Sequence, residues 1–268
     1  MKNCLLLASV IATASGASAA VTYTGVPYTQ NFDTLASSGL DTLFTDDSTL
    51  PGWTAYSGDS GYTNSGPFPF SINPVGTATA DAYDADTGSA NAGELYSYGS
   101  AGSSERALGS LASGSSFDFF LALQVTNGTT QALSSFTLQY DGEQWRRGNN
   151  ATQRAESILF YYRIGGTALD STGTWTSVGS LDFVSPDISA AAAAALDGNA
   201  NKVTLSQTVS ASLNPGESIW LVWVDPDNAG TDHGMAIDNV SLSFVPEPGS
   251  ALLAGAAASL ALLRRRRA

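Results

Sequence analysis

The sequence predicts an all-β protein, a two-sheet antiparallel sandwich of jelly-roll type formed by residues 21–244. Clusters of Gly, Ser, Thr, Asn and Asp interrupt the chain at intervals of roughly 8 to 15 residues, the spacing of turns between short strands. The stretches between the clusters are rich in aromatic and β-branched residues, and several alternate in polarity. Repeated short strands without long helical patterns are typical of two packed sheets.

Six segments carry the strand pattern most clearly. Residues 133–145 begin with alternating apolar and polar side chains, as expected of a strand with one buried face. Residues 217–227 are almost entirely apolar in their centre, which indicates a strand covered on both faces. We therefore expect Trp220 and Trp223 to lie in the core. The other predicted strands lie in 115–125, 156–166, 201–213 and 234–244.

One segment, residues 185–201, is predicted to form a short helix. It contains six consecutive alanines, and alanine is the strongest helix former. Pro186 and Asp187 supply a start signal, while Asp197 and Gly198 supply a stop signal.

Residues 1–20 are predicted to be a secretory signal peptide. Lys2 precedes an apolar run that begins at Cys4, and small residues with Ala-x-Ala spacing follow at Ala17 and Ala19. This pattern places cleavage after Ala19 or after the alanine that follows it. We expect the remaining chain to be exported through the inner membrane. The alternative, a buried N-terminal helix, fits the Ala- and Ser-rich run poorly.

The sequence ends with an apolar run followed by basic residues. Ala251–Leu263 is uncharged and about 13 residues long, whereas a helix needs about 20 residues to span a bilayer comfortably. Arginine side chains can extend from such a helix to the interface, and they mark its cytoplasmic side. The pattern predicts one short membrane helix with the ectodomain outside. The basic block consists of Arg264, Arg265, Arg266 and Arg267.

The residues before this run are Val245, Pro246, Glu247 and Pro248. Together with the apolar run and the arginine cluster they resemble the PEP-CTERM protein-sorting domain, also described as an ice-binding protein C-terminal domain. The resemblance implies that an exosortase recognises Pro-Glu-Pro and that the helix anchors the protein in the membrane only until processing. It also implies that the processed protein associates with exopolysaccharide in the cell envelope, at the cell surface or outside the cell. The prolines suit this role because they hold the backbone extended.

The expected mature domain is strongly acidic. The chain has 11 Lys and Arg residues against 24 Asp and Glu residues. Setting aside Lys2, the four terminal arginines and Glu247 leaves six basic and 23 acidic residues, a net charge of about −17. This charge argues against nucleic acid or anionic lipid as a partner. Cys4 is the only cysteine and His233 the only histidine, so we expect neither a disulfide nor a zinc or copper site.

An acidic loop is the leading candidate for a calcium site. Asp225, Asp227, Asp232 and Asp238 lie within fourteen residues, and Ca²⁺ takes about six to eight oxygen ligands. We expect Asp33 to join them, because the first and last strands of a sandwich often pair. The alternative is a solvated turn in which aspartates bond the backbone. A second acidic candidate comprises Asp81, Asp84 and Asp86.

Trp145 and Arg146 are the candidate glycan contacts. They follow a predicted strand and precede a polar loop, so we expect Trp145 to face solvent beside a guanidinium that can bond hydroxyls or carboxylates. The alternative is structural: Arg106 or Arg146 pairs with Glu105 or Glu143 and joins two strands.

Recognisable catalytic patterns are missing from the sequence. It contains no Gly-x-Ser-x-Gly turn, no Glu-x-Asp-x-x-Glu strand and no glycine-rich phosphate loop before a helix. We therefore predict a non-enzymatic protein without catalytic residues. A glycan hydrolase with an unrecognised carboxylate pair is the least favoured alternative.

Motifs spread over residues 21–244 resemble an uncharacterised bacterial extracellular jelly-roll domain; among them are "YTQNFDTLASSG", "YDGEQWR" and "DHGMAIDNVSLSF". The resemblance implies fold and secretion and leaves activity open. The sequence as a whole predicts an exported cell-surface or extracellular-matrix protein that an exosortase sorts and that associates with exopolysaccharide. The alternative function is a calcium-dependent carbohydrate-binding module.

Overall fold

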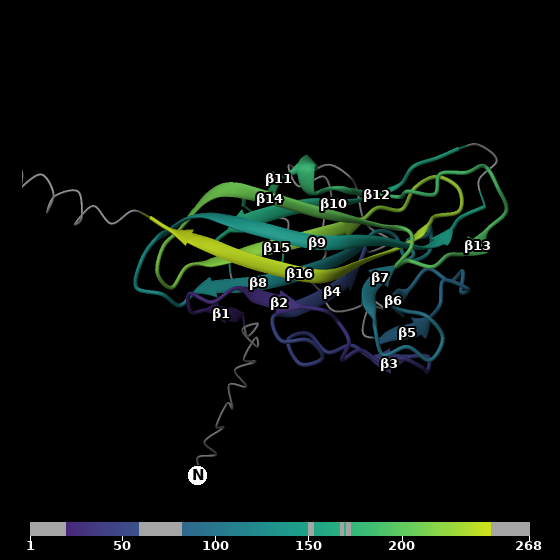
Figure 1. Ribbon diagram of the computed structural model, residues 1–268, viewed down its shortest axis with the longest axis horizontal. Coiled ribbons are helices and arrows are strands. Elements are labelled where there is room, and N and C mark those ends of the chain that lie inside the picture. Colours follow the sequence, from purple (N-terminus) through teal and green to yellow (C-terminus); the bar gives the residue numbers. More distant parts are fainter. Residues whose placement is uncertain (1–19, 59–81, 150–152, 167–168, 170–172, 248–268) are drawn as a thin grey trace, which may run out of the picture.

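The structure, a computed structural model, describes residues 20–58, 82–149, 153–166, 169 and 173–247. In this part of the chain, two β-sheets lie face to face, and the predicted jelly-roll sandwich is confirmed (Figure 1). Residues 1–19 of the predicted signal peptide lie outside the described residues. Pro248, the apolar run and the four terminal arginines lie outside them as well. None of the described helical turns has the length and apolarity needed to cross a bilayer.

The first sheet is built on three long antiparallel strands. They are β8 (Phe119–Asn127), β15 (Ser218–Asp225) and β10 (Ser157–Ile164), in that order across the sheet. β1 (Val21–Tyr23) and β4 (Trp53–Ser57) share the outer edge of β8. β11 (Thr176–Ser177) and β12 (Phe183–Val184) pair with β10, and a short 3₁₀ turn at Gly179–Leu181 separates them.

The second sheet is also built on three long strands. They are β14 (Lys202–Leu213), β9 (Leu133–Arg147) and β16 (Gly234–Pro246). The short β13 (Ala194–Ala195) continues the line of β14 along β9. On the far side of β16 lie β2 (Tyr28–Gln30) and β7 (Ala107–Ser110). The sheet extends from β7 through β6 (Leu95–Tyr98), β5 (Ala82–Asp86) and β3 (Thr42–Leu43).

The long strands alternate between the two sheets along the chain. β8, β10 and β15 belong to the first sheet, while β9, β14 and β16, which follow them in turn, belong to the second. Figure 1 shows β9, β14 and β16 in front of β8 and β15. Each strand places apolar side chains between the layers. Trp223 is fully buried there and stacks on Trp53 with 5.4 Å between ring centroids. Trp220 is 1% exposed, so the predicted burial of both tryptophans is confirmed.

The six predicted strands are present, but the predicted helix at 185–201 is wrong. Ala194 and Ala195 instead form β13, which pairs with Arg146 and Arg147 of β9. The segment before β13 is held on β9 by side chains: Gln144 exchanges two hydrogen bonds with the backbone of Asp187. Six alanines make fewer than two helical turns, too short to be stable alone, so bonds to the sheet edge determine the conformation.

Candidate metal centre

Three carboxylates converge on the outer face of the second sheet. Glu143 lies on β9 and Asp238 on the neighbouring β16, while Glu105 lies in the turn just before β7. One oxygen from each carboxylate lies within 4.8 Å of the other two. Glu143 is 0% and Asp238 1% exposed, and Glu105 is half-buried. We call this group the carboxylate triad.

Each member of the triad has one oxygen in a hydrogen bond and one without. Glu143 accepts a bond of 2.8 Å from the indole N–H of Trp145, and Asp238 accepts one of 2.7 Å from the amide of Asn239. Glu105 accepts one of 2.8 Å from Asn199. The second oxygen of each carboxylate is buried and has no hydrogen-bond partner. Buried polar atoms nearly always have a partner, and a hard divalent cation takes carboxylate oxygens as ligands.

Burial dominates the electrostatics of the triad. It raises the pKa of Glu143 to about 7, and Glu105 adds to the shift while Trp145 opposes it. Burial raises the pKa of Asp238 to about 8, with further contributions from Glu143, Glu105 and the carboxylate of Asp33. The nearest ammonium group, that of Lys202, forms its ion pair with Asp141 at 2.8 Å. Burial therefore favours the protonated over the charged forms of Glu143 and Asp238.

The sequence predicted part of this centre. β2 pairs with β16, with Gln30 opposite Val240, which brings Asp33 close enough to act on Asp238. One carboxylate oxygen of Asp33 accepts a 3.1 Å bond from the backbone N–H of Arg106, next to Glu105. Glu105 and Glu143 were not among the ligands predicted from the sequence. They lie far from Asp238 in the chain, and only strand register brings them together.

The other predicted calcium ligands lie elsewhere. Asp225 ends β15 in the first sheet, and the charges that act on it are those of Asp232, Glu156 and Asp118. Asp227 lies close enough to Asp232 to raise its pKa. The structure thus divides the five predicted ligands between two places, with Asp33 and Asp238 in one and the remaining three in the other.

The expectation that Trp145 faces solvent is wrong. Its ring is 1% exposed and stacks on Tyr98 at 6.0 Å between centroids. A Cβ at Gly198 would overlap the indole, so the backbone of that loop covers the ring. Arg146 is 8% exposed and donates hydrogen bonds of 3.1 Å to the carbonyls of Gly88 and Ser89. Neither side chain is presented at the surface as a platform for a sugar.

The structural alternative for the arginines takes a different form from the expected ion pair. Arg106 is 1% exposed and donates from its guanidinium to the hydroxyl of Ser97 at 2.8 Å and to the carbonyl of Ser97. Arg106 and Arg146 thus donate to neutral oxygens and not to the carboxylates of Glu105 and Glu143.

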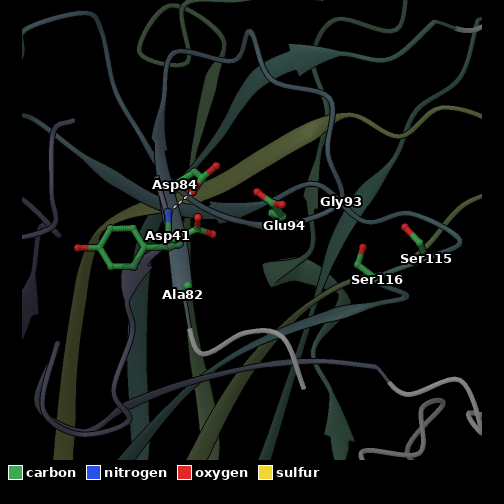
Figure 2. A pocket seen from close by; sticks show the side chains of 8 residues that line it. Asp41, Ala82, Asp84, Gly93, Glu94, Ser115 and Ser116 are labelled. Atoms are coloured by element: carbon green, nitrogen blue, oxygen red, sulfur yellow. Dashed lines mark hydrogen bonds between the residues drawn. The ribbon is translucent and has the colours of Figure 1, made fainter. Parts of the chain in front are cut away.

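A surface pocket of about 480 Å³ lies beside β5. Figure 2 shows the carboxylates of Asp41, Asp84 and Glu94 on one side and the hydroxyls of Ser115 and Ser116 on the other. The backbone N–H of Asp41 donates a 2.7 Å bond to Asp84. Burial and then the carboxylate of Asp84 raise the pKa of Glu94. Of the second predicted acidic candidate, Asp84 lines the pocket, Asp86 bonds Ser89 instead, and Asp81 lies outside the described residues.

No protein-family model and no curated protein matches this chain. Among solved structures, the chain is similar to the CBM22-1 xylan-binding domain of Paenibacillus barcinonensis Xyn10C, at 11% identity over 74% of this chain and 88% of that chain, with a TM-score of 0.33. It is similar to the K3 cleaved adhesin domain of Lys-gingipain from Porphyromonas gingivalis, at 12% identity over 72% and 91%, with a TM-score of 0.36.

A third similarity is to the enzymatically active domain of tailspike protein 4 from bacteriophage CBA120, at 8% identity and a TM-score of 0.32. That match takes in 53% of this chain and only 16% of the phage chain. TM-scores of this size bear neither on ligand nor on activity. The sandwich described above follows from the strand pairing of this chain itself.

Proposed function

We propose that this chain is an exported surface or matrix protein, without a catalytic role, whose sandwich binds Ca²⁺ at the carboxylate triad. The observation that carries the proposal is the convergence of three carboxylates, each of which also has one buried oxygen without a hydrogen-bond partner. A bound ion would join β9, β16 and the turn before β7. Such a link suits an exported domain whose sequence offers no second cysteine for a disulfide.

Calorimetric titration of the full chain with CaCl₂ tests the calcium site. We expect the unaltered chain to bind, and Glu143→Gln to weaken that binding at least tenfold because the ion loses a charged ligand. Glu217→Gln is the matched control, since it makes the same change in the turn after Leu213, which pairs with Leu133 at the opposite end of β9 from the triad. Calcium binding that Glu143→Gln leaves unchanged would contradict the assignment.

We further propose that an exosortase sorts the protein through Val245–Pro248. The support is the resemblance of the tail together with the position of its first residues. Val245 is 49% exposed at the end of β16, and Glu247 follows on the surface. Replacing Pro246, Glu247 and Pro248 with alanine should leave unprocessed protein in the membrane fraction. Release of this variant at the normal rate would refute the proposal.

The pocket beside β5 supports a second candidate function, glycan binding. Its carboxylates accept hydrogen bonds and its two serine hydroxyls both donate and accept, which suits sugar hydroxyls. The exopolysaccharide of the producing cell is the natural probe. We expect Asp84→Asn to reduce retention on immobilised exopolysaccharide, and equal retention would exclude the pocket. Hydrolysis of the polymer that Glu94→Gln abolishes would overturn the non-enzymatic assignment.

A further inference from the structure

We propose that Asn239 is a positioning residue for the carboxylate triad, and that its side-chain amide holds the carboxylate of Asp238 in the orientation that a bound ion requires. The inference rests on the proposed function, because it concerns the calcium site at the triad. It adds to that site a residue that does not itself bind the ion.

A β-bulge in β16 places Asn239 beside the triad. The register of β16 on β9 shifts between Asp238 and Ser241, where two residues of β16 lie opposite one residue of β9. Ile237 before the bulge and Val240 after it are 0% and 1% exposed, and both belong to the core between the sheets. Side chains of a regular strand alternate between its faces, so two core residues three positions apart require the extra residue. The bulge thus leaves Asp238 and Asn239 as neighbours outside the core.

The backbone of the bulge does not by itself explain an asparagine. Asn239 has a φ of 51°, in the left-handed region. Asparagine tolerates this region better than most residues, but glycine adopts it at a lower cost. The amide group gives the reason for asparagine, because a glycine would lack the hydrogen bonds that this group donates.

The amide nitrogen of Asn239 donates to two carboxylates. It lies 2.7 Å from Oδ2 of Asp238 and 3.3 Å from Oδ2 of Asp141. The bond to Asp238 occupies one oxygen of that carboxylate and leaves the other, which is buried without a hydrogen-bond partner, for the ion. Asp141 is held in turn by the ammonium group of Lys202 at 2.8 Å and by the hydroxyl of Thr204.

These contacts fix the amide independently of a metal ion. The ion pair between Asp141 and Lys202 involves no atom of the triad, so it anchors Asn239 before an ion arrives. Hydrogen bonds from outside the coordination shell orient ligating carboxylates in this way, and loss of one typically weakens metal affinity 10–100-fold. Asn239 therefore prepares Asp238 for the ion.

Calorimetric titration of the full chain with CaCl₂ tests the inference. We expect Asn239→Gly to raise the dissociation constant about 10–100-fold, because glycine accepts the positive φ but donates no bond to Asp238. Asn239→Ala also lacks the amide and should weaken binding to the same extent, so it provides a second variant if Asn239→Gly does not fold. Asn214→Gly is the matched control. It removes an amide that donates to Glu217, in the turn at the opposite end of β9 from the triad, and should leave the constant unchanged.

A double-mutant cycle separates positioning from a general effect on the fold. In the Asp238→Asn background, Asn239→Gly should change the dissociation constant less than about twofold, because the carboxylate through which the amide acts is already lost. Equal weakening in both backgrounds would overturn the positioning role. Calcium binding that Asn239→Gly leaves unchanged would also overturn it, with the triad still standing as the calcium site. The absence of calcium binding by the unaltered chain would instead refute the triad, and the role of Asn239 with it.

Discussion

Replacing Asp238 with asparagine removes one charge from the carboxylate triad while keeping the size of the side chain. Two opposite effects follow. In the presence of a chelator, burial and then the charges of Glu143, Glu105 and Asp33 disfavour the charged form of Asp238, a cost that neutral asparagine does not carry, so the thermal midpoint of the variant should equal or exceed that of the unaltered chain. In the presence of calcium, the variant lacks a charged ligand, so the order of the two midpoints should reverse.

The size of the calcium effect follows from mass action. At a calcium concentration 100 times the dissociation constant, a ligand of the native state adds about 2.7 kcal/mol to the free energy of unfolding. For a domain of about 225 residues, each kcal/mol raises the midpoint by roughly 2–4 °C, which gives a shift of about 5–11 °C. A site weakened one hundredfold gains only about 0.4 kcal/mol at the same concentration, a shift of roughly 1–2 °C.

Differential scanning calorimetry of the full chain, with calcium and with chelator, measures both effects. Glu217→Gln serves as the control, because it removes a carboxylate from the turn after Leu213, which pairs with Leu133 at the opposite end of β9 from the triad. A full calcium shift in Asp238→Asn would refute the role of Asp238 as a ligand. The absence of any shift in the unaltered chain would refute the calcium site itself.

Two further predictions concern pH and backbone packing. Since burial raises the pKa of Glu143 to about 7 and of Asp238 to about 8, the folded chain holds more protons than the unfolded chain between about pH 4 and pH 8. With chelator, the free energy of unfolding should therefore fall as pH rises through this range, while the stabilisation by calcium should grow. Denaturant titrations at several pH values measure both trends. A free energy of unfolding that rises with pH in chelator would contradict the prediction. Gly88→Ala should destabilise the fold by about 1–3 kcal/mol more than Gly102→Ala. Both glycines have positive φ, but only at Gly88 would a Cβ collide with the backbone of Trp145. Equal losses of stability in denaturant titrations would contradict this prediction.

The long strands were predictable because alternating polarity or, in β15, a continuous apolar run indicates which of their faces are buried. In β9 the alternation ends part-way along the strand. Exposed or half-buried side chains interrupt the buried ones up to Gln139, but from Asp141 to Arg146 the side chains on both faces of the strand are buried. Two distant loops cover the outer face: one bonds Arg146 through Gly88 and Ser89, and the other lays Gly198 over Trp145. Burial by distant loops does not appear as a periodic pattern in the strand's own sequence, so the sequence predicted that Trp145 lies at the surface.

The candidate site was partly predictable for the same reason. Asp33 and Asp238 could be placed together because the pairing of early and late strands in a sandwich is a rule of topology. Glu105 and Glu143 required the register of β7, β9 and β16, including the irregularity between Asp238 and Ser241. The helix predicted for the alanine run was wrong for a different reason. The helix propensity of the alanines is weak, and the hydrogen bonds between Gln144 and the backbone of Asp187 outweigh it.

The position of β16 has a consequence for how the protein matures. This strand is the last of the described strands along the chain, yet it lies inside the second sheet, between β9 on one side and β2 and β7 on the other. The sheet is therefore incomplete until the ribosome has made nearly the whole domain, and Asp238 reaches its neighbours only at that step. The last described strand to leave the ribosome is thus the one that completes both the second sheet and the carboxylate triad.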